Sequence, residues 1–164
     1  MEIRHIRADE GPLLRDLCRR MLTDSPEAYE DTLEETESRP ADFWEGRARR
    51  ASDGRMSAIF VAEDGGECVG TATGFSVDDL AAWGMLAALW VKPECRRQGI
   101  GRALITAVED WARANSIMQL RLWVADNNVA AKALYISSGF DVANVTRPIP
   151  SNPSVQEILM MRQF

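Results

Sequence analysis

The stretch from Val91 to Arg102 constrains the fold more than any other part of the chain. An apolar run stops at Pro93, a helical pattern begins at Gly99, and Arg96 and Arg97 crowd the junction. The first N–H groups of a helix lack intrahelical partners and lie at the positive end of the helix dipole, so such a junction binds anions. Glycine permits close approach of a phosphate, and arginine stays ionised. We therefore expect a strand, a phosphate-binding loop and a helix in that order.

Two familiar phosphate loops do not fit this junction. A P-loop requires Gly-x-x-x-x-Gly-Lys followed by Ser or Thr, and the chain contains no such string. A dinucleotide fingerprint requires a third glycine where Leu104 stands, and a longer connection containing Pro93 replaces its tight turn. The remaining motif is Arg-x-x-Gly-x-Gly, from Arg96 to Gly101. Taken alone it also fits a turn with solvated arginines, so the flanking segments decide between these interpretations.

The flanking sequence predicts a strand–helix–strand unit. Apolar residues recur with helical spacing after the junction, at Ile100, Ala103, Leu104, Ala107, Val108 and Trp111. Asn115 is a helix stop signal, and alternation from Met118 to Val124 predicts the next strand. Because a crossover between parallel strands is right-handed by default, we expect the helix to start at the carboxyl edge of the sheet, where ligands usually bind.

A second segment, Asn127 to Phe140, carries three residues of interest at helical spacing. Asn128, Ala131 and Tyr135 lie at i, i+3 and i+7, so they share one helix face, and Gly139 suits the helix end. Together with Arg-x-x-Gly-x-Gly, the pattern Asn-x-x-Ala-x-x-x-Tyr-x-x-x-Gly-Phe resembles the signatures of the GCN5-related N-acetyltransferases, the GNAT family. The alternative interpretation of Tyr135 is a core residue with its hydroxyl at the rim.

The resemblance implies an α/β (α+β) fold in a single domain, residues 1–164. The GNAT fold has a central mixed, mostly antiparallel sheet of six to seven strands, splayed at the cofactor cleft, and about four helices. The order of patterns along this chain is similar, weakly before Ser57 and firmly from Leu86 to Phe140. Asp64-Gly65-Gly66 between two β-rich runs adds a strong hairpin signal.

The function implied by the resemblance is direct transfer of an acetyl group from acetyl-CoA to a primary amine. The strand end would pair with the pantetheine arm, and the loop and helix start would hold the diphosphate. The cofactor-binding residues so implied are Leu89, Trp90, Val91, Arg96, Arg97, Gln98, Gly99, Ile100, Gly101, Arg102, Asn128, Ala131 and Tyr135. Tyr135 would also be the catalytic acid, because a phenol with a pKa of about 10 can protonate the departing thiolate.

A general base for the acceptor amine is harder to assign. GNAT enzymes often place a carboxylate on the strand before the phosphate loop, but Trp83 to Val91 contains none. The remaining candidates are Asp78, Asp79 or an acid between Asp24 and Glu37, acting through water. That last segment holds seven acids, no basic residue and Tyr29 as an apolar anchor. It is either a solvated acidic loop or a wall of the acceptor site that attracts cations.

Two other functions stay open at this point. One is a GNAT-like module that binds CoA or a partner protein without catalysis. The other is an acyltransferase of the same fold that acts on a protein N-terminus or uses another acyl-CoA. The sequence does not specify the acceptor, which is a small molecule or a peptide amine, and the resemblance also allows a homodimer.

Composition argues against several other classes. A net charge of −6 without a basic stripe outside the phosphate loop argues against nucleic-acid binding. The longest nearly apolar run, Ala81 to Val91, is too short to cross a membrane, and the start of the chain lacks the features of a secretory signal. We therefore expect a cytoplasmic protein without membrane contact. Three scattered cysteines and His5 as the only histidine predict neither disulfides nor a metal site.

Overall fold

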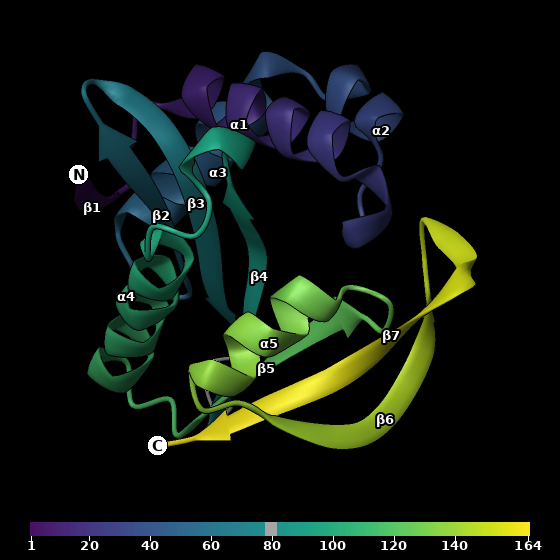
Figure 1. Cartoon of the computed structure of the whole chain (residues 1–164). Helices are drawn as coiled ribbons and strands as arrows, with labels where there is room; N and C mark the ends of the chain where they lie inside the picture. The colour runs from purple at the N-terminus through teal and green to yellow at the C-terminus, as the bar shows by residue number, and fades with distance from the viewer. Residues whose placement is uncertain (78–81) are drawn as a thin grey trace.

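A seven-stranded sheet with the strand order β1-β2-β3-β4-β5-β7-β6 forms the centre of the protein (Figure 1). The computed structural model describes residues 1–77 and 82–164. The strands are β1 (Glu2–His5), β2 (Ser57–Asp64), β3 (Glu67–Ser76), β4 (Trp83–Val91), β5 (Gln119–Ala125), β6 (Asp141–Ile149) and β7 (Asn152–Gln163). Neighbouring strands are antiparallel except β4 and β5, which are parallel. The predicted mixed, mostly antiparallel sheet is thereby confirmed.

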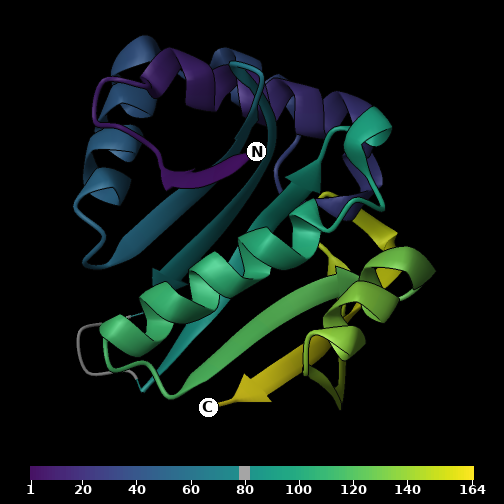
Figure 2. The same cartoon turned by 60° about the vertical axis from the view of Figure 1, so that its left-hand side comes forward.

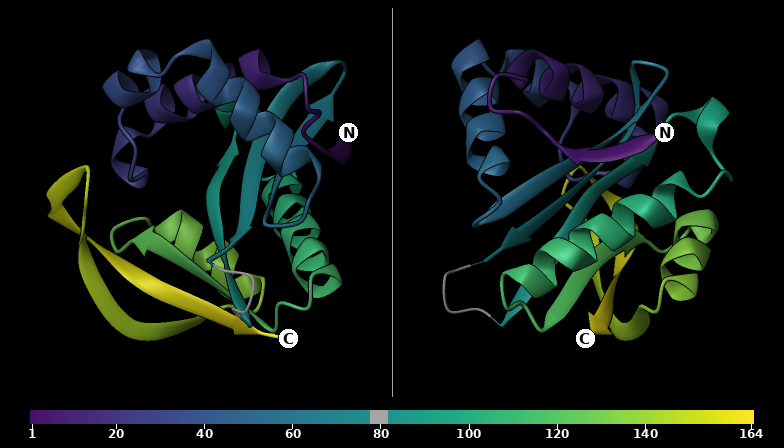
Figure 3. Two further views of the ribbon diagram at one scale, coloured as in Figure 1. Left: turned by 180° about the vertical axis from the view of Figure 1, so that it is seen from behind. Right: turned by 90° about the vertical axis from the view of Figure 1, so that its left-hand side faces the viewer.

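The helices cover the two faces of this sheet. They are α1 (Gly11–Asp24), α2 (Leu33–Ser38), α3 (Ala41–Ser52), α4 (Ile100–Ala114) and α5 (Val129–Ser137), with short 3-10 helices η1 (Pro26–Ala28) and η2 (Pro93–Cys95). The helices α1 and α3 lie against one face of the first strands, and α4 crosses the opposite face (Figures 2 and 3). Within the described ranges, no helix is both long and apolar enough to span a membrane.

The alternation of side chains along β2 divides the core between these two faces. Ile59 joins a buried cluster with Trp44 of α3, whereas its neighbour Phe60 joins the cluster that contains Trp111 of α4. The helix α4 packs unusually close to β3 at Gly74, where an added Cβ would lie 2.7 Å from the Trp111 ring. This tight packing holds α4 at a fixed place on the sheet, so the start of α4 is rigidly positioned.

The sheet splays between β4 and β5, as the resemblance predicts. The parallel pairing of these strands covers only Trp83–Met85 of β4, so the second half of β4 has an edge that β5 does not use. The register of β3 against β4 also shifts, because Thr71 pairs with Trp90 but Thr73 pairs with Ala87. The extra residue is a β-bulge, and Ala88 there adopts a left-handed conformation with φ of 52°. The strand β4 therefore bends away from β5 and opens a cleft.

Two segments differ from the sequence-based expectations. The prolines between Arg147 and Pro153 favour an interruption of the strands there, but β6 continues to Ile149 and β7 begins at Asn152, so only a hairpin turn separates the two strands. Pro148 is tolerated because β6 is the outermost strand of the sheet, where a missing N–H breaks no ladder. The acidic stretch also folds, into η1 and α2, with a reciprocal capping box between Thr32 and Glu35. Of the two interpretations of this segment, the one as a solvated loop is therefore wrong.

Candidate active site

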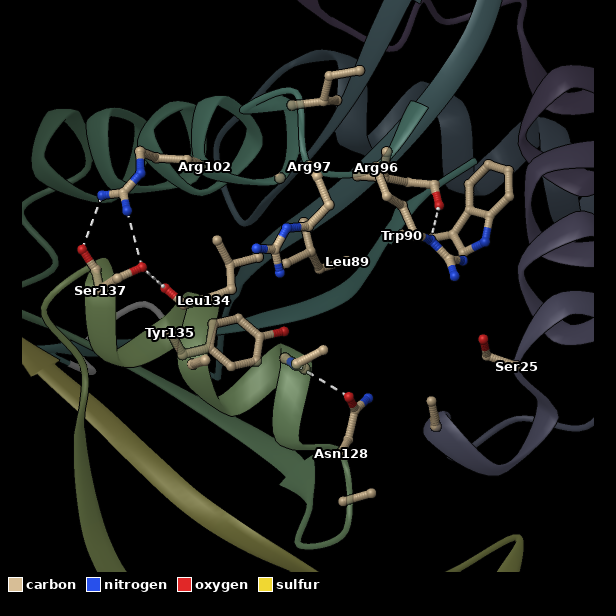
Figure 4. A pocket seen from close by; sticks show the side chains of 18 of the residues that line it. Ser25, Leu89, Trp90, Arg96, Arg97, Arg102, Asn128, Leu134, Tyr135 and Ser137 are labelled. Atoms are coloured by element: carbon tan, nitrogen blue, oxygen red, sulfur yellow. Dashed lines mark hydrogen bonds between the residues drawn. The ribbon is translucent and has the colours of Figure 1, made fainter. Parts of the chain in front are cut away.

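A cavity of about 770 Å³ lies where β4 and β5 part (Figure 4). Its walls come from η1, the end of β4, the start of α4 and one face of α5. The predicted cofactor-binding residues that line it are Leu89, Trp90, Val91, Arg96, Arg97, Gly99, Ile100, Gly101, Arg102, Asn128, Ala131 and Tyr135. Gln98 does not belong to the lining, because its amide donates to the Glu94 carbonyl at 3.3 Å on the exposed side of the loop. The fold thus gathers two motifs from separate parts of the sequence around one space.

The start of α4 presents backbone N–H groups to this cavity. Gly99 is the N-cap residue and has φ of 86°, a left-handed conformation that glycine adopts without strain. The first intrahelical bond runs from the Ala103 N–H to the Gly99 carbonyl, so the preceding N–H groups of the first turn lack helical acceptors. Gly101 keeps the approach open, since a Cβ there would lie 3.0 Å from Cδ2 of Leu134. A phosphate can therefore touch the helix backbone at this point.

The three arginines of the junction have different surroundings. The Nε of Arg96 donates to the Val91 carbonyl at 2.9 Å, and its guanidinium pairs with Asp24 at the end of α1. Arg102 donates to the carbonyl and the Oγ of Ser137, both at 2.9 Å, and so joins α4 to α5. The side chain of Arg97 extends into the cavity between these two (Figure 4). Arg97 is thus placed to contact a bound anion, while the other two brace the cavity walls.

The cleft edge of β4 offers further backbone groups. The Lys92 N–H donates to the Val69 carbonyl at 2.8 Å, so by the antiparallel alternation the backbone groups of Trp90 face β3 and those of Val91 face the cleft. The Leu89 carbonyl, at the bulge, is also turned away from β3, because it accepts the Tyr29 hydroxyl. Since β5 pairs only with Trp83–Met85 of β4, strand pairing leaves the cleft side of Val91 free, and Leu89 and Val91 both line the cavity. An extended chain with amide or thioester carbonyls can pair with this edge in the manner of an added strand.

Tyr135 lies on the opposite wall, and its hydroxyl points into the space between α5 and β4 (Figure 4). The ring packs edge-on against Phe140 with centroids 5.9 Å apart, and the residue is 8% exposed. Burial raises the pKa of the Tyr135 phenol above its ordinary value, so it keeps its proton at neutral pH. Asn128 caps α5, because its Oδ1 accepts the Ala131 N–H at 3.1 Å, and this cap orients the helix that carries Tyr135.

The acids of the segment from Asp24 to Glu37 are mostly paired. Asp24 binds Arg96 and the indole N–H of Trp90, and these bonds with that of Ser25 outweigh burial and keep the pKa of Asp24 low. The other pairs are Glu30 with Arg147, Asp31 with Arg39, and Glu37 with Arg15 and Arg19. Glu27 is the acid of this segment that lines the cavity. The segment is therefore neither a solvated loop nor a strongly negative surface.

The other candidates for a base are also placed. Asp78 and Asp79 fall outside the described residues. Strand β4 carries no carboxylate, as its sequence shows. Among residues 1–77 and 82–164, no group of His, Cys, Asp and Glu is arranged to hold a metal ion.

Three cavity-lining residues of η1 and its flanks are not singled out for the site by the sequence, namely Ser25, Ala28 and Tyr29, whereas Glu27 is one of the acids considered there as a base. The sequence indicates Tyr29 only as an apolar anchor of the acidic segment. Its hydroxyl donates to the Leu89 carbonyl at 3.0 Å, across 60 positions of sequence. Such a contact depends on tertiary packing, and a tyrosine within an otherwise acidic run was the only local signal.

Comparisons with known proteins agree with this arrangement. The model of the family described as "Acetyltransferase (GNAT) family" matches residues 15–140. The chain is similar to aminoglycoside N(6')-acetyltransferase type 1 of Klebsiella aerogenes, at 30% identity over 84% of this chain and 95% of that protein. It is also similar to the ribosomal protein bS18-alanine N-acetyltransferase of Escherichia coli K12, at 32% identity over 76% of this chain and 80% of that protein.

Two more similarities bear on length and fold. The chain spans 38% of the length of mycothiol acetyltransferase from Beutenbergia cavernae, with 30% identity over 74% of this chain. Among solved structures, YncA of Salmonella typhimurium, described as a putative acetyltransferase with its cofactor acetyl-CoA, superposes with a TM-score of 0.80 at 17% identity. That superposition covers 99% of this chain and 93% of the other, so the two share one fold.

Proposed function

Because the chain belongs to the acetyltransferase (GNAT) family, we propose that its cavity binds acetyl-CoA and passes the acetyl group directly to a primary amine. The observation that carries this proposal is the meeting of three features in one cavity. These are the open first turn of α4, the free cleft edge of β4 and the hydroxyl of Tyr135. Each feature serves a different part of the thioester cosubstrate, and none of them needs a metal ion.

The cavity fits the cosubstrate in its charged and its amide portions. The N–H groups of the first turn of α4 would accept the diphosphate, with Arg97 adding a charge-assisted bond. Gly101 supports this assignment, because a Cβ would fill the cradle between α4 and Leu134. The N–H groups of Leu89 and Val91 would bind carbonyl oxygens of the extended arm. Acetyl-CoA then supplies the acetyl group as a thioester.

Tyr135 would hold the proton that the leaving sulfur needs. Its hydroxyl lies in the cavity wall opposite β4, and burial keeps it protonated. A backbone N–H at the β4 bulge, that of Leu89, would stabilise negative charge that develops on the thioester oxygen. The acceptor amine must itself lose a proton, and Glu27 is the carboxylate of the segment from Asp24 to Glu37 that lines the cavity. We propose that Glu27 accepts this proton from the amine through a water molecule.

The acceptor stays a primary amine of a small molecule or a peptide. The names of the two relatives point in different directions, one to an aminoglycoside and one to an alanine of ribosomal protein bS18. Pairing of the acids in the segment from Asp24 to Glu37 removes most of the negative potential that would select polycations. We therefore propose no general preference for polyamines on charge alone.

Three further parts of the proposal concern the protein as a whole. Residues 1–164 would form one catalytic domain, since a single sheet runs from Glu2 to Gln163. The free thiols of Cys18, Cys68 and Cys95 suit a reducing cytoplasm. A homodimer is a separate prediction, for which light scattering of the purified protein at two concentrations is the measurement.

Thiol release from acetyl-CoA tests the function. Purified protein is incubated with acetyl-CoA and, in turn, with spermidine, kanamycin, lysine and a short peptide with N-terminal alanine. Mass spectrometry identifies each acetylated product. We expect release to depend on at least one amine and to yield one acetyl group per thiol. If acetyl-CoA binds but no amine is acetylated, the chain is a CoA-binding module and the catalytic proposal is wrong.

A further inference from the structure

The carbonyl groups on the cleft edge of β4 are covered by side chains from other elements. Arg96 covers that of Val91, and Tyr29 covers that of Leu89 at 3.0 Å. What the edge presents to the cavity is therefore its N–H groups. The contact from Tyr29 falls at the bulge, on the same residue, Leu89, whose N–H the proposed function assigns to the thioester oxygen.

The bulge needs such a support. Ala88 has φ of 52°, a region that side chains with a Cβ avoid, so the bulge is strained and would relax without restraint. Pairing with β3 restrains the backbone of Trp90, because Thr71 of β3 is its partner. On the cleft side, the Tyr29 hydroxyl holds the peptide group that follows Leu89. The peptide unit between Leu89 and Trp90 is thereby held from both sides, and it directly follows the peptide unit that carries the Leu89 N–H.

Tyr29 is itself anchored from outside the cavity. The Oγ of Ser151, in the β6–β7 turn, donates to the Tyr29 carbonyl at 2.7 Å. The next residue, Glu30, pairs with Arg147, which also donates to Glu157 of β7 at 2.6 Å. The hairpin, η1 and the bulge thus form one connected unit. Burial raises the pKa of the Tyr29 phenol, so the hydroxyl stays a donor.

We propose that Tyr29 is a positioning residue for acetyl transfer, which aims the Leu89 N–H at the thioester carbonyl by holding the Leu89 carbonyl. This inference rests on the proposed function of the cavity. Tyr29 acts through the backbone of β4 and exchanges no proton with the substrates. A donor that stabilises charge in the reacting state must be held within a small angle, so loosening it lowers the rate more than the affinity.

The variant Tyr29→Phe removes the hydroxyl and keeps the ring. We expect kcat to fall by about 10- to 100-fold with the best amine of the panel above, while affinity for CoA stays within about twofold. CoA lacks the thioester carbonyl. If the wild type binds acetyl-CoA more tightly than CoA, the ratio of the two affinities should therefore fall toward one in the variant. Isothermal titration with each ligand and initial rates of thiol release provide these values.

Two further variants separate positioning from a general loss of structure. Thr23→Val removes a bond of similar kind, from the Thr23 hydroxyl to the Arg19 carbonyl at 2.7 Å, outside the cavity, and should leave kcat unchanged. Ser151→Ala releases the anchor of Tyr29 and should lower kcat less than Tyr29→Phe does. Thermal unfolding by circular dichroism checks that each variant is folded.

The outcomes are distinct. An unchanged kcat in Tyr29→Phe overturns the inference, and so does a parallel loss of kcat and CoA affinity, because that pattern marks a merely structural role. If the wild type acetylates no amine, the proposed function fails. The inference is then decided by the ratio of acetyl-CoA to CoA affinity, and a ratio equal in wild type and Tyr29→Phe refutes it.

Discussion

Replacing Gly101 by valine should separate ligand binding from folding. The residue lies in the first turn of α4, where a Cβ would be 3.0 Å from Cδ2 of Leu134 and 3.9 Å from Cγ2 of Val91. Both neighbours line the cavity, so the two methyl groups of valine would occupy the space in which a diphosphate meets the helix. Leu134 can move at its flexible end, and valine is slightly better than glycine in a helix, by about 0.3 kcal/mol.

The expected magnitude follows from the bonds that the valine blocks. If the diphosphate loses two charge-assisted hydrogen bonds, each worth about 1.5 kcal/mol, binding weakens by about 3 kcal/mol, which is about a 100-fold rise in Kd. The free energy of unfolding should change by less than about 1 kcal/mol, so Tm should shift by no more than about 4 °C.

Isothermal titration with acetyl-CoA and thermal unfolding measure the two quantities on the same sample. Gly46→Val is the matched control, because this glycine lies inside α3 and its nearest neighbour is the end of the Arg50 side chain at 3.3 Å. The control should bind acetyl-CoA like the wild type. Unchanged binding in Gly101→Val would refute the assignment of the diphosphate to the start of α4, and an equal loss in both variants would point to an effect on folding.

Three further outcomes are expected. Tyr135→Phe should lower kcat by about 10- to 10⁴-fold with acetyl-CoA affinity unchanged, and equal rates in both proteins would remove Tyr135 from the mechanism. Because burial raises the pKa of Tyr135, loss of its proton should not lower the wild-type kcat between about pH 8 and 10. Arg97→Ala should weaken acetyl-CoA binding about tenfold in titrations at low salt and less at high salt; a salt-independent effect would contradict a charge contact. Glu10→Gln should lower the free energy of unfolding at pH 7 by about 1 to 2 kcal/mol, because the hydrogen bonds from Arg4 lower the pKa of Glu10. That stability is present above the ordinary carboxyl pKa and is lost as pH falls through the lowered one, so acid titrations of the two proteins should converge; a constant difference would refute this.

The sequence by itself determined the chemistry-bearing motifs and their local structure. The local structure of the two motifs, Arg96 to Gly101 and Asn128 to Tyr135, depends on residues only a few positions apart. Helical spacing, glycine conformation and helix capping could therefore be predicted from the sequence. The order of strands and helices followed for the same reason, because periodicity is a local property. A proline is accepted in a strand only where that strand lies at the edge of a sheet, and local sequence does not show which strand that is. Pro148, in the outer strand β6, therefore gave a misleading signal of interruption.

Only the tertiary structure decided which groups are free to act. Three arginines at one junction look equivalent in the sequence, yet Arg96 is taken by Asp24 and Arg102 by Ser137, which leaves Arg97 to extend into the cavity. Glu30 and Glu37, which follow α1, are likewise paired with arginines distant in the chain. Tyr29 meets the β4 bulge across 60 positions. Such pairings depend on long-range packing, in which a partner is selected by its place in space, and no spacing within the sequence encodes that place.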